Sequence, residues 1–132
     1  MQSEFDTLAA QGLGVTAQKR SPDLTLTAQF FSPDGSRIVY RASRPKTAAE
    51  IKEYKDYLAQ HLVAPTNMEI FTCKADGTDV RQVTHLGKAN WAPFYHPSGK
   101  KIVFSSNHHS KRGYDFQIYM VNEDGTGLEQ IT

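Results

Sequence analysis

Short apolar runs separated by turns that contain glycine or proline dominate the chain from about residue 28 onward. Examples are Ile38-Val39-Tyr40, Ile102-Val103-Phe104 and Ile118-Tyr119-Met120-Val121. Each run is rich in β-branched and aromatic residues, and its apolar positions are consecutive, which is typical of strands covered on both faces. A helix would need longer runs, so the pattern predicts an all-β chain of short strands that are covered on both sides.

The pattern occurs twice. Residues 31–40 (FSPDGSRIVY) return as residues 95–104 (YHPSGKKIVF), and residues 69–78 (EIFTCKADGT) return as residues 117–126 (QIYMVNEDGT). The first pair is offset by 64 positions and the second by 48, so the copies differ in the segment between their halves. We predict four antiparallel strands in each copy, over residues 27–32, 36–43, 68–75 and 80–84 and then 91–96, 100–106, 116–122 and 128–132.

Turn chemistry explains why these residues recur. Pro33-Asp34-Gly35 and Pro97-Ser98-Gly99 combine a fixed φ, a side chain that bonds its own backbone and a residue that accepts positive φ. Asp76-Gly77 and Asp124-Gly125 predict two-residue hairpin turns of the primed type, which require positive φ at their centre. His96 lies beside the first turn of the second copy, and we interpret it as a polar turn residue.

Repeated units of four strands, in which each sheet is covered by its neighbours, are the blades of a β-propeller. The predicted fold class is therefore all-β: a partial β-propeller with two four-stranded antiparallel blades and one helical insertion. We assign residues 1–27 to an N-terminal remnant of uncertain structure, 28–84 to the first blade and 85–132 to the second. The helical insertion, at about residues 46–63, lies between the second and third strands of the first blade.

The repeats also resemble a known family. Residues 31–40, 70–71 and 75–84 of the first copy, and 122–132 of the second, are similar to the WD40-like repeat of TolB-type propellers. The resemblance covers about residues 28–132. It implies a rigid scaffold that presents loops to protein partners in the periplasm or another extracytoplasmic compartment. The same blade recurs in the propellers of prolyl oligopeptidase-like serine peptidases, so the repeat does not imply one function.

The insertion carries the signals of a helix. Thr47 and Glu50 have the spacing of a capping box, and Lys52 and Asp56 form an i,i+4 pair of opposite charge. An apolar stripe follows at helical spacing, and it consists of Ile51, Tyr54, Leu58 and Leu62. We expect Pro65 to end the helix. The helix either packs its stripe on the propeller rim or serves as an arm that docks a partner or another subunit.

Closed propellers typically have four to eight blades, whereas the repeats found here make two. We therefore expect either a fragment of a longer protein or a ring completed by several copies, with self-association through exposed blade faces. The first twenty residues contain Glu4 and Asp6 and lack the apolar core of a signal peptide. Since TolB-like proteins are usually periplasmic, we expect the N-terminus of the parent protein to lie upstream.

Composition and motifs exclude several classes of function. A net charge of +1 gives no reason to expect a nucleic-acid partner, and no apolar run reaches the length of a membrane span. No motif indicates a cofactor, a nucleophile elbow or a zinc-binding helix. Cys73 takes the repeat position of Val121, which predicts a buried apolar role. His108 and His109 have no third ligand nearby in sequence, so a solvated loop is favoured over a metal site.

Strand parity predicts where recognition occurs. In up-and-down blades the tight turns all lie at one end, whereas the irregular segments 44–67, 85–90 and 107–115 all lie at the other. Binding residues concentrate on loops held by a rigid scaffold. Our candidate binding residues are therefore Arg44, His85, Lys88, Asn90, Trp91, His108, His109 and Arg112. Their cations favour an acidic or carboxylate-bearing ligand, such as part of a protein or peptide partner.

The predicted function is non-catalytic binding by a TolB-like scaffold. The alternative is that the chain forms part of the propeller of a prolyl oligopeptidase-like serine peptidase. In that case it would position peptides for a catalytic domain that lies outside this sequence. A Gly-x-Ser-x-Gly domain encoded downstream would favour the peptidase, whereas an upstream signal peptide followed by further blades and a stop would favour the binder.

Overall fold

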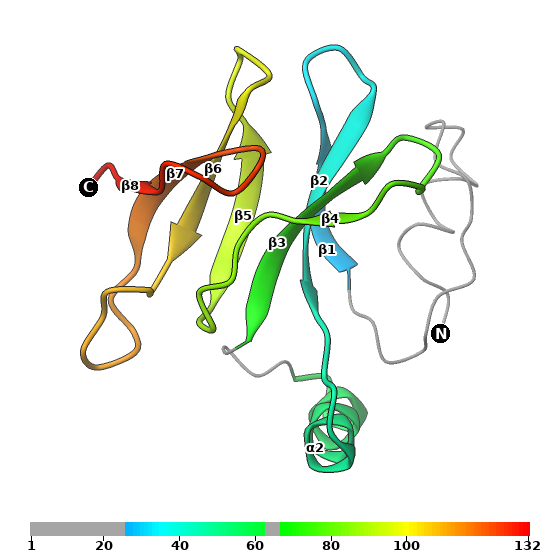
Figure 1. The fold of residues 1–132 in the computed structure, drawn as a ribbon. Coiled ribbons are helices and arrows are strands. Elements are labelled where there is room, and N and C mark those ends of the chain that lie inside the picture. The colour runs from blue at the N-terminus through cyan, green and yellow to red at the C-terminus, as the bar shows by residue number, and fades with distance from the viewer. Residues whose placement is uncertain (1–25, 63–66) are drawn as a thin grey trace.

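Two four-stranded antiparallel sheets make up most of the computed structural model, which describes residues 26–62 and 67–132 (Figure 1). The first sheet runs in the order β1 (Leu26–Phe31), β2 (Arg37–Ser43), β3 (Met68–Lys74) and β4 (Arg81–Gln82). The second runs in the order β5 (Asn90–Tyr95), β6 (Lys101–Ser106), β7 (Gln117–Asn122) and β8 (Glu129–Gln130). Helix α2 (Ala48–Ala59) joins β2 to β3. The prediction of two propeller-type blades with one helical insertion is confirmed.

The fourth strand of each blade is shorter than predicted, because a side chain replaces the backbone as a hydrogen-bond acceptor. β4 and β8 contain two residues each. The N–H of Ile70 donates to the hydroxyl of Thr84 at 2.9 Å, where a continuing strand would offer a carbonyl. The N–H of Ile118 donates to the hydroxyl of Thr132 in the same way, also at 2.9 Å. The sheet therefore ends at equivalent positions in both blades.

The N-terminal boundary of the first blade also differs from the prediction. β1 begins at Leu26, so Leu26 and Thr27 belong to the blade and not to the N-terminal remnant. Residues 1–25 of that predicted remnant lie outside the described residues. β5 begins at Asn90, one position before the predicted start of its strand.

The hairpin turns are not of the predicted two-residue type. In the β3–β4 turn the N–H of Gly77 donates to the carbonyl of Lys74 at 2.8 Å, and the N–H of Lys74 donates to the carbonyl of Thr78 at 2.8 Å. These bonds enclose a three-residue loop in which only Gly77 has positive φ, at 84°. The same pair of bonds recurs around Gly125 in the β7–β8 turn. One glycine after the aspartate is sufficient, because a loop of this type needs positive φ only at its last position.

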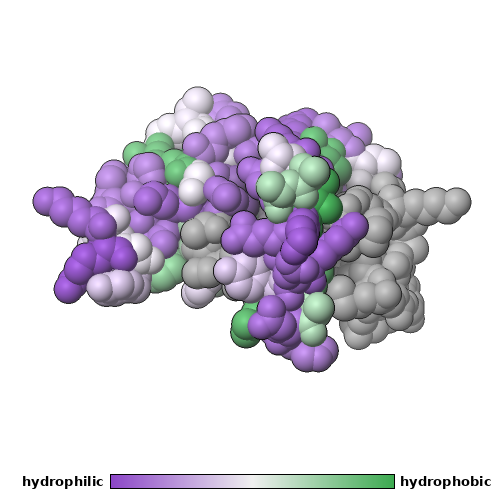
Figure 2. Space-filling model, turned by 90° about the horizontal axis from the view of Figure 1, so that it is seen from below, coloured by the Kyte–Doolittle hydropathy of each residue, from purple (hydrophilic) through white to green (hydrophobic). Residues whose placement is uncertain are grey.

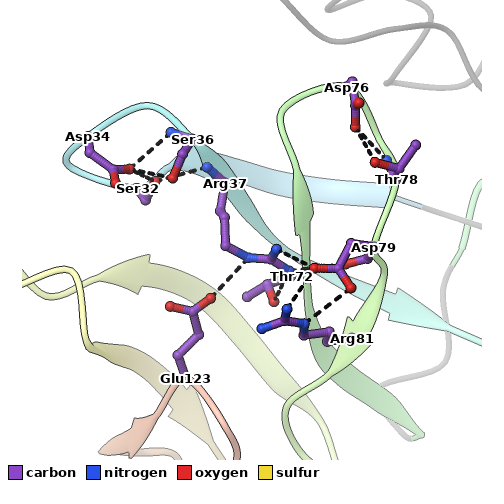
Figure 3. Close-up of polar contacts among 10 residues, drawn as sticks. All are labelled: Ser32, Asp34, Ser36, Arg37, Thr72, Asp76, Thr78, Asp79, Arg81 and Glu123. Atoms are coloured by element: carbon purple, nitrogen blue, oxygen red, sulfur yellow. Dashed lines mark hydrogen bonds and ion pairs between the residues drawn. The ribbon is translucent and has the colours of Figure 1, made fainter.

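Polar side chains brace the turns between the first two strands of each blade. One carboxylate oxygen of Asp34 accepts hydrogen bonds from the hydroxyls of Ser32 and Ser36, both at 2.7 Å (Figure 3). These bonds lower the pKa of Asp34 to about 2. In the second blade the N–H of Ser98 donates to Nδ1 of His96 at 3.1 Å. The interpretation of His96 as a polar turn residue is confirmed.

Both faces of the first blade are buried, as its consecutive apolar residues predicted. One face carries a cluster of Ile38, Tyr40, Ala42, Phe71 and Cys73, none more than 4% exposed. Val39 belongs to a second cluster that faces the other blade. Alternate residues of β2 therefore enter two separate cores. Cys73 is a buried free thiol, which confirms its predicted role.

The second cluster joins the two blades into one body. It contains Val39, Ile70 and Val83 from the first blade and Tyr95, Ile102, Phe104, Tyr119 and Val121 from the second. The rings of Phe104 and Tyr119 stack with their centroids 5.9 Å apart. Burial of this apolar surface holds one sheet against the next, as expected for neighbouring propeller blades.

Arg37 adds a polar link between the blades at the end that carries the tight turns. Its guanidinium pairs with Asp79 of the first blade at 2.9 Å and with Glu123 of the second blade at 3.0 Å (Figure 3). It also donates to the hydroxyl of Thr72 at 3.0 Å. The Arg37 side chain is only 13% exposed. Burial, together with the nearby charge of Glu123, raises the pKa of Tyr95 in the same region, so its hydroxyl stays neutral.

Helix α2 begins as the sequence predicted. The Thr47 hydroxyl accepts the N–H of Glu50 at 3.2 Å, and the Glu50 carboxylate accepts the N–H of Thr47 at 2.9 Å, which completes the capping box. The predicted pair of Lys52 and Asp56 is an ion pair at 2.6 Å. Both local signals are confirmed.

The helix ends earlier than predicted and stays near the surface. It stops at Ala59, and His61 has a φ of 58°, which leaves the helical path. Leu62 is therefore not on the helical stripe, and Pro65 lies outside the described residues. No residue of α2 is buried, and Tyr54 is half-buried. The helix lies beyond the end of the first blade and outside both cores (Figure 1).

Candidate binding surface

The irregular connections of both blades lie at one end of the sheets. We call this end the loop face and define it by residues 44–62, 85–89 and 107–116. The four tight turns, at residues 32–37, 75–79, 96–101 and 123–127, lie at the opposite end, which we call the turn face (Figure 1). This division follows from the antiparallel order of each sheet. Figure 2 views the molecule from the loop face, where hydrophilic residues predominate and apolar residues form separate patches.

Glu69, at the start of β3, holds the connection between the blades. Its carboxylate accepts the N–H of Gly87 at 2.6 Å and the side-chain amide of Asn90 at 3.2 Å, and it also accepts the Thr84 hydroxyl. The segment from Thr84 to Asn90 therefore wraps around one carboxylate. The sequence patterns did not single out Glu69. The repeat could have indicated its role, because Glu69 and Thr84 occupy the same repeat positions as Gln117 and Thr132. In the second blade the Thr132 hydroxyl donates to the side-chain oxygen of Gln117 at 2.8 Å.

Asn90 links the two blades from a fully buried position. Its amide donates to the carbonyl of Met68 at 2.7 Å, and its side-chain oxygen accepts the Ser106 hydroxyl at 2.7 Å. The amide is thus satisfied inside the protein. In this structure Asn90 positions the loops, and its selection as a binding residue stays a prediction.

The loop from Asn107 to Asp115 is fixed by hydrogen bonds to its neighbours and to itself. The side-chain oxygen of Asn107 accepts the N–H of Ala89 at 2.9 Å, and its amide donates to the carbonyl of Gly113 at 2.8 Å. The Ser110 hydroxyl accepts the N–H of Gly113 at 2.8 Å. The loop is therefore held to the 85–89 segment, so the surfaces of the two irregular connections are coupled.

His108 and His109 form a small aromatic cluster on this loop. Their ring centroids are 4.4 Å apart, and Nδ1 of His109 lies 2.7 Å from the Tyr119 hydroxyl. Burial lowers the pKa of His108, and the nearby His109 and Lys88 act in the same direction. His108 is therefore a neutral imidazole near pH 7. The positive charge of the loop face comes from its exposed arginine and lysine side chains.

Trp91 lies half-buried where the two blades meet. Its ring stacks on Phe116 with centroids 4.8 Å apart, and the guanidinium of Arg41 lies 5.4 Å from its centroid. The indole N–H points to the sulfur of Met68 at 3.2 Å. These contacts fix the ring and engage its indole N–H, so Trp91 has no free hydrogen-bond donor.

A cleft of about 390 Å³ opens between α2 and the end of the first blade. Glu53, Tyr54 and Tyr57 line it from the helix, and Phe71 lines it from β3. Arg44 and His85 are also part of the lining. The guanidinium of Arg44 lies 4.4 Å from the centroid of the Phe71 ring. The sequence patterns did not indicate this cleft, because its two walls are brought together only by the fold.

Comparison with curated sequences finds relatives that are much longer than this chain. An uncharacterised protein of Agrobacterium fabrum is 26% identical over 107 residues, which are 76% of this chain and 29% of that protein. Dipeptidyl-peptidase 5 of Porphyromonas gingivalis is 30% identical over 97 residues, which are 70% of this chain and 12% of the peptidase. The chain thus spans less than a third of the length of either relative. No protein-family model matches it.

Solved structures identify the fold. A protein assigned as TolB from Agrobacterium tumefaciens superposes with a TM-score of 0.58 at 22% identity, covering 84% of this chain and 34% of that one. TolB from Acinetobacter baumannii superposes with a TM-score of 0.54 at 23% identity, covering 80% of this chain and 20% of that one. The chain has the fold of a TolB-type β-propeller. An oligogalacturonate lyase also superposes, with a TM-score of 0.56 at 17% identity, covering 87% of this chain and 25% of the lyase, so the same fold occurs in an enzyme.

In this TolB-type fold the eight candidate residues do not form a single site. Arg44 and His85 line the cleft, whereas His108, His109 and Arg112 belong to the loop of the second blade. Lys88 is exposed on the segment between these two groups, and Asn90 and Trp91 lie beneath it. Arg112 is itself exposed and lies 3.5 Å from the Asp115 carboxylate. The TolB-like blades therefore present two neighbouring patches on one face.

Within residues 26–62 and 67–132, no group of three or more histidine, cysteine or acidic side chains is arranged to hold a metal ion. None of the helices in that part of the chain is long and apolar enough to cross a membrane.

Proposed function

We propose that this chain is a non-catalytic TolB-like scaffold that recognises a protein or peptide partner through its loop face. We also propose that it works in the periplasm or another extracytoplasmic compartment. The single observation that carries the proposal is the arrangement of the loops. Every irregular connection among the described residues lies on one face, and Glu69, Asn90 and Asn107 hold two of them, segments 85–89 and 107–116, to the blades. Rigidly held loops lose little conformational entropy on binding, which favours recognition.

The charge of the loop face indicates the chemistry of the partner. Arg44, Lys88 and Arg112 are exposed on it, and within the described residues their one ion pair is the 3.5 Å contact of Arg112 with Asp115. Exposed cations attract a carboxylate-bearing partner and raise its rate of association. We therefore propose an acidic segment of a protein or peptide as the ligand.

The test compares cations on opposite faces. Random peptides displayed on phage are selected against the immobilised chain, and the enriched peptides are then measured by fluorescence polarisation. The double variant K88A/R112A is expected to bind them roughly tenfold more weakly, because charge-assisted bonds contribute to affinity. The matched double variant K74A/K100A removes two exposed lysines near the turn face and should bind normally. Equal losses in both variants, or no enrichment, would contradict the proposal.

One observation favours a second candidate function. The similarity to dipeptidyl-peptidase 5 of Porphyromonas gingivalis reaches 30% identity over 70% of this chain. In that alternative the blades would form part of a peptidase propeller and position peptide substrates for a catalytic domain. The sequence encoded next to this chain distinguishes the two, since a Gly-x-Ser-x-Gly domain belongs only to the peptidase alternative.

We also propose that two copies of the chain associate through the outward face of the second blade. This face carries Val103, Ile118 and Ile131, which are the repeat equivalents of Val39, Ile70 and Val83. The three residues of the first blade are buried between the blades, whereas Ile118 is 38% and Ile131 49% exposed. The apolar cluster on the outward face of the first blade is already buried. The exposed apolar face of each copy is therefore that of the second blade, and we propose that these two equivalent faces pack against each other.

Sedimentation velocity tests this association across a range of concentrations. The unmodified chain should shift from monomer to dimer, and I118K should remain monomeric, because a charge cannot be buried unpaired in an apolar contact. V80K is the matched control, since Val80 is a similarly exposed aliphatic residue, at 42%, outside this face. A chain that stays monomeric at every concentration, or a V80K variant that also dissociates, would refute the proposed contact.

A further inference from the structure

We propose that the cleft between α2 and the first blade binds the carboxylate of an acidic peptide side chain, with Arg44 as the residue that pairs with it. The inference rests on the proposed function, because it assigns one part of the loop face to the ligand. It differs from that function in naming the cleft and one anchor residue. The cleft volume of about 390 Å³ lies within the range typical of small binding sites, which is about 300–1,000 Å³.

Two of the three acidic residues in the cleft are already committed to the fold. Glu50 accepts the N–H groups of Lys46 and Thr47, both at 2.9 Å, and these bonds lower its pKa. Glu69 is bound by Gly87 and Asn90, as described above. A carboxylate that already accepts hydrogen bonds keeps its negative charge but has fewer acceptor positions left to compete for the Arg44 guanidinium. Glu53 is the remaining acid, and it is exposed on α2.

Arg44 is held in position but has no carboxylate partner among the described residues. Its guanidinium is 4.4 Å from the centroid of Phe71, within the range of a cation–π contact. Stacking on an aromatic ring restrains the guanidinium plane and leaves its N–H edges free to bind a carboxylate with two parallel hydrogen bonds. The fold therefore supplies a preorganised cation at the wall of the cleft.

The remaining lining suits a peptide better than a small isolated anion. Tyr54 and Tyr57 form an aromatic wall on α2, and Asn67, Gln82 and His85 contribute polar groups. Tyrosine rings supply contact area at a low cost in conformational entropy, and amide groups can bond a peptide backbone. An acidic side chain flanked by apolar or aromatic residues would match the cation and the aromatic wall together.

The experiment uses three fluorescent peptides with the full chain. The first is acetylated and amidated and contains Phe-Glu-Phe, the second has Gln in place of Glu, and the third is the Gln peptide with a free terminal carboxylate. We expect the Glu peptide to bind roughly tenfold more tightly than the Gln peptide, because the charged pair is lost in the latter. The third peptide distinguishes a side-chain carboxylate from a terminal one, and binding it as tightly as the Glu peptide would overturn the assignment to an acidic side chain.

Single variants locate the contact. R44Q is expected to abolish the preference for Glu over Gln, and R44K should retain part of it, because lysine keeps the charge but not the planar fork. R81Q removes an exposed arginine near the turn face, outside the cleft, and should leave the preference intact. If R44Q keeps the preference, the inference is overturned. A loss in K88A/R112A together with normal binding in R44Q would overturn the cleft assignment alone and leave the proposed function standing.

Discussion

Replacing Ile70 with alanine is expected to lower the free energy of unfolding by about 3 kcal/mol. Ile70 has no exposed surface and lies in the apolar cluster between the blades. Alanine lacks the outer carbons of isoleucine, so their burial no longer stabilises the folded state. The change also leaves a cavity that the two packed sheets cannot close. Urea denaturation followed by circular dichroism measures the loss, provided that the transition stays cooperative.

The second blade supplies a matched control at the same repeat position. Ile118 is the equivalent of Ile70 and is followed by Tyr119 as Ile70 is followed by Phe71, but it is 38% exposed. The change I118A should therefore cost less than about 1 kcal/mol. Both variants should be measured at low protein concentration, so that association of copies does not contribute. Equal losses would show that the contact between the blades contributes little to stability.

Replacing Arg37 with methionine is expected to lower the free energy of unfolding by about 2–4 kcal/mol. The change keeps the apolar stem of the side chain but leaves Asp79 and Glu123 without their shared cation. The cost is large because the Arg37 side chain is mostly buried, so water cannot fully replace the lost pairing. The measurement is again denaturant unfolding, together with a double-mutant cycle of Arg37 and Glu123.

Arg81 is the control for this prediction, because it pairs with the same Asp79 at 2.7 Å but is 59% exposed. The change R81M should cost less than about 1 kcal/mol, as is usual for exposed ion pairs. The cycle should give a favourable coupling energy between Arg37 and Glu123, which belong to different blades. A coupling energy of zero would mean that the polar link does not contribute to joining the blades.

Local sequence was sufficient to predict the order of the strands, the positions of the turns and the start of the helix. The apolar runs that include Ile38 and Ile118, the glycine after each aspartate and the capping box at Thr47 act over a few residues. Their effects are therefore visible in short segments. The errors also have local explanations: Thr84 ended β4 early by offering a side-chain acceptor, and the turn around Gly77 was one residue longer than predicted.

The candidate site could be predicted only in part. Strand parity correctly placed the irregular segments at one end of the blades, because it depends only on the antiparallel order. It could not show that Asn90 is fully buried or that Glu69 binds the segment that follows Thr84. It also could not show the cleft, since α2 and β3 approach each other only after the chain has folded.

The contrast between Ile70 and Ile118 shows what required the tertiary structure. Their local sequences are similar and both lie in third strands of a blade, so propensity and turn chemistry treat them alike. Ile70 is buried because the second blade packs on its face, whereas Ile118 keeps part of its surface exposed. Arg37 is a similar case, since its partner Asp79 is 42 positions away and Glu123 belongs to the other blade. Burial and pairing depend on which surfaces meet, and that information resides in the packing of the blades and not in any one repeat.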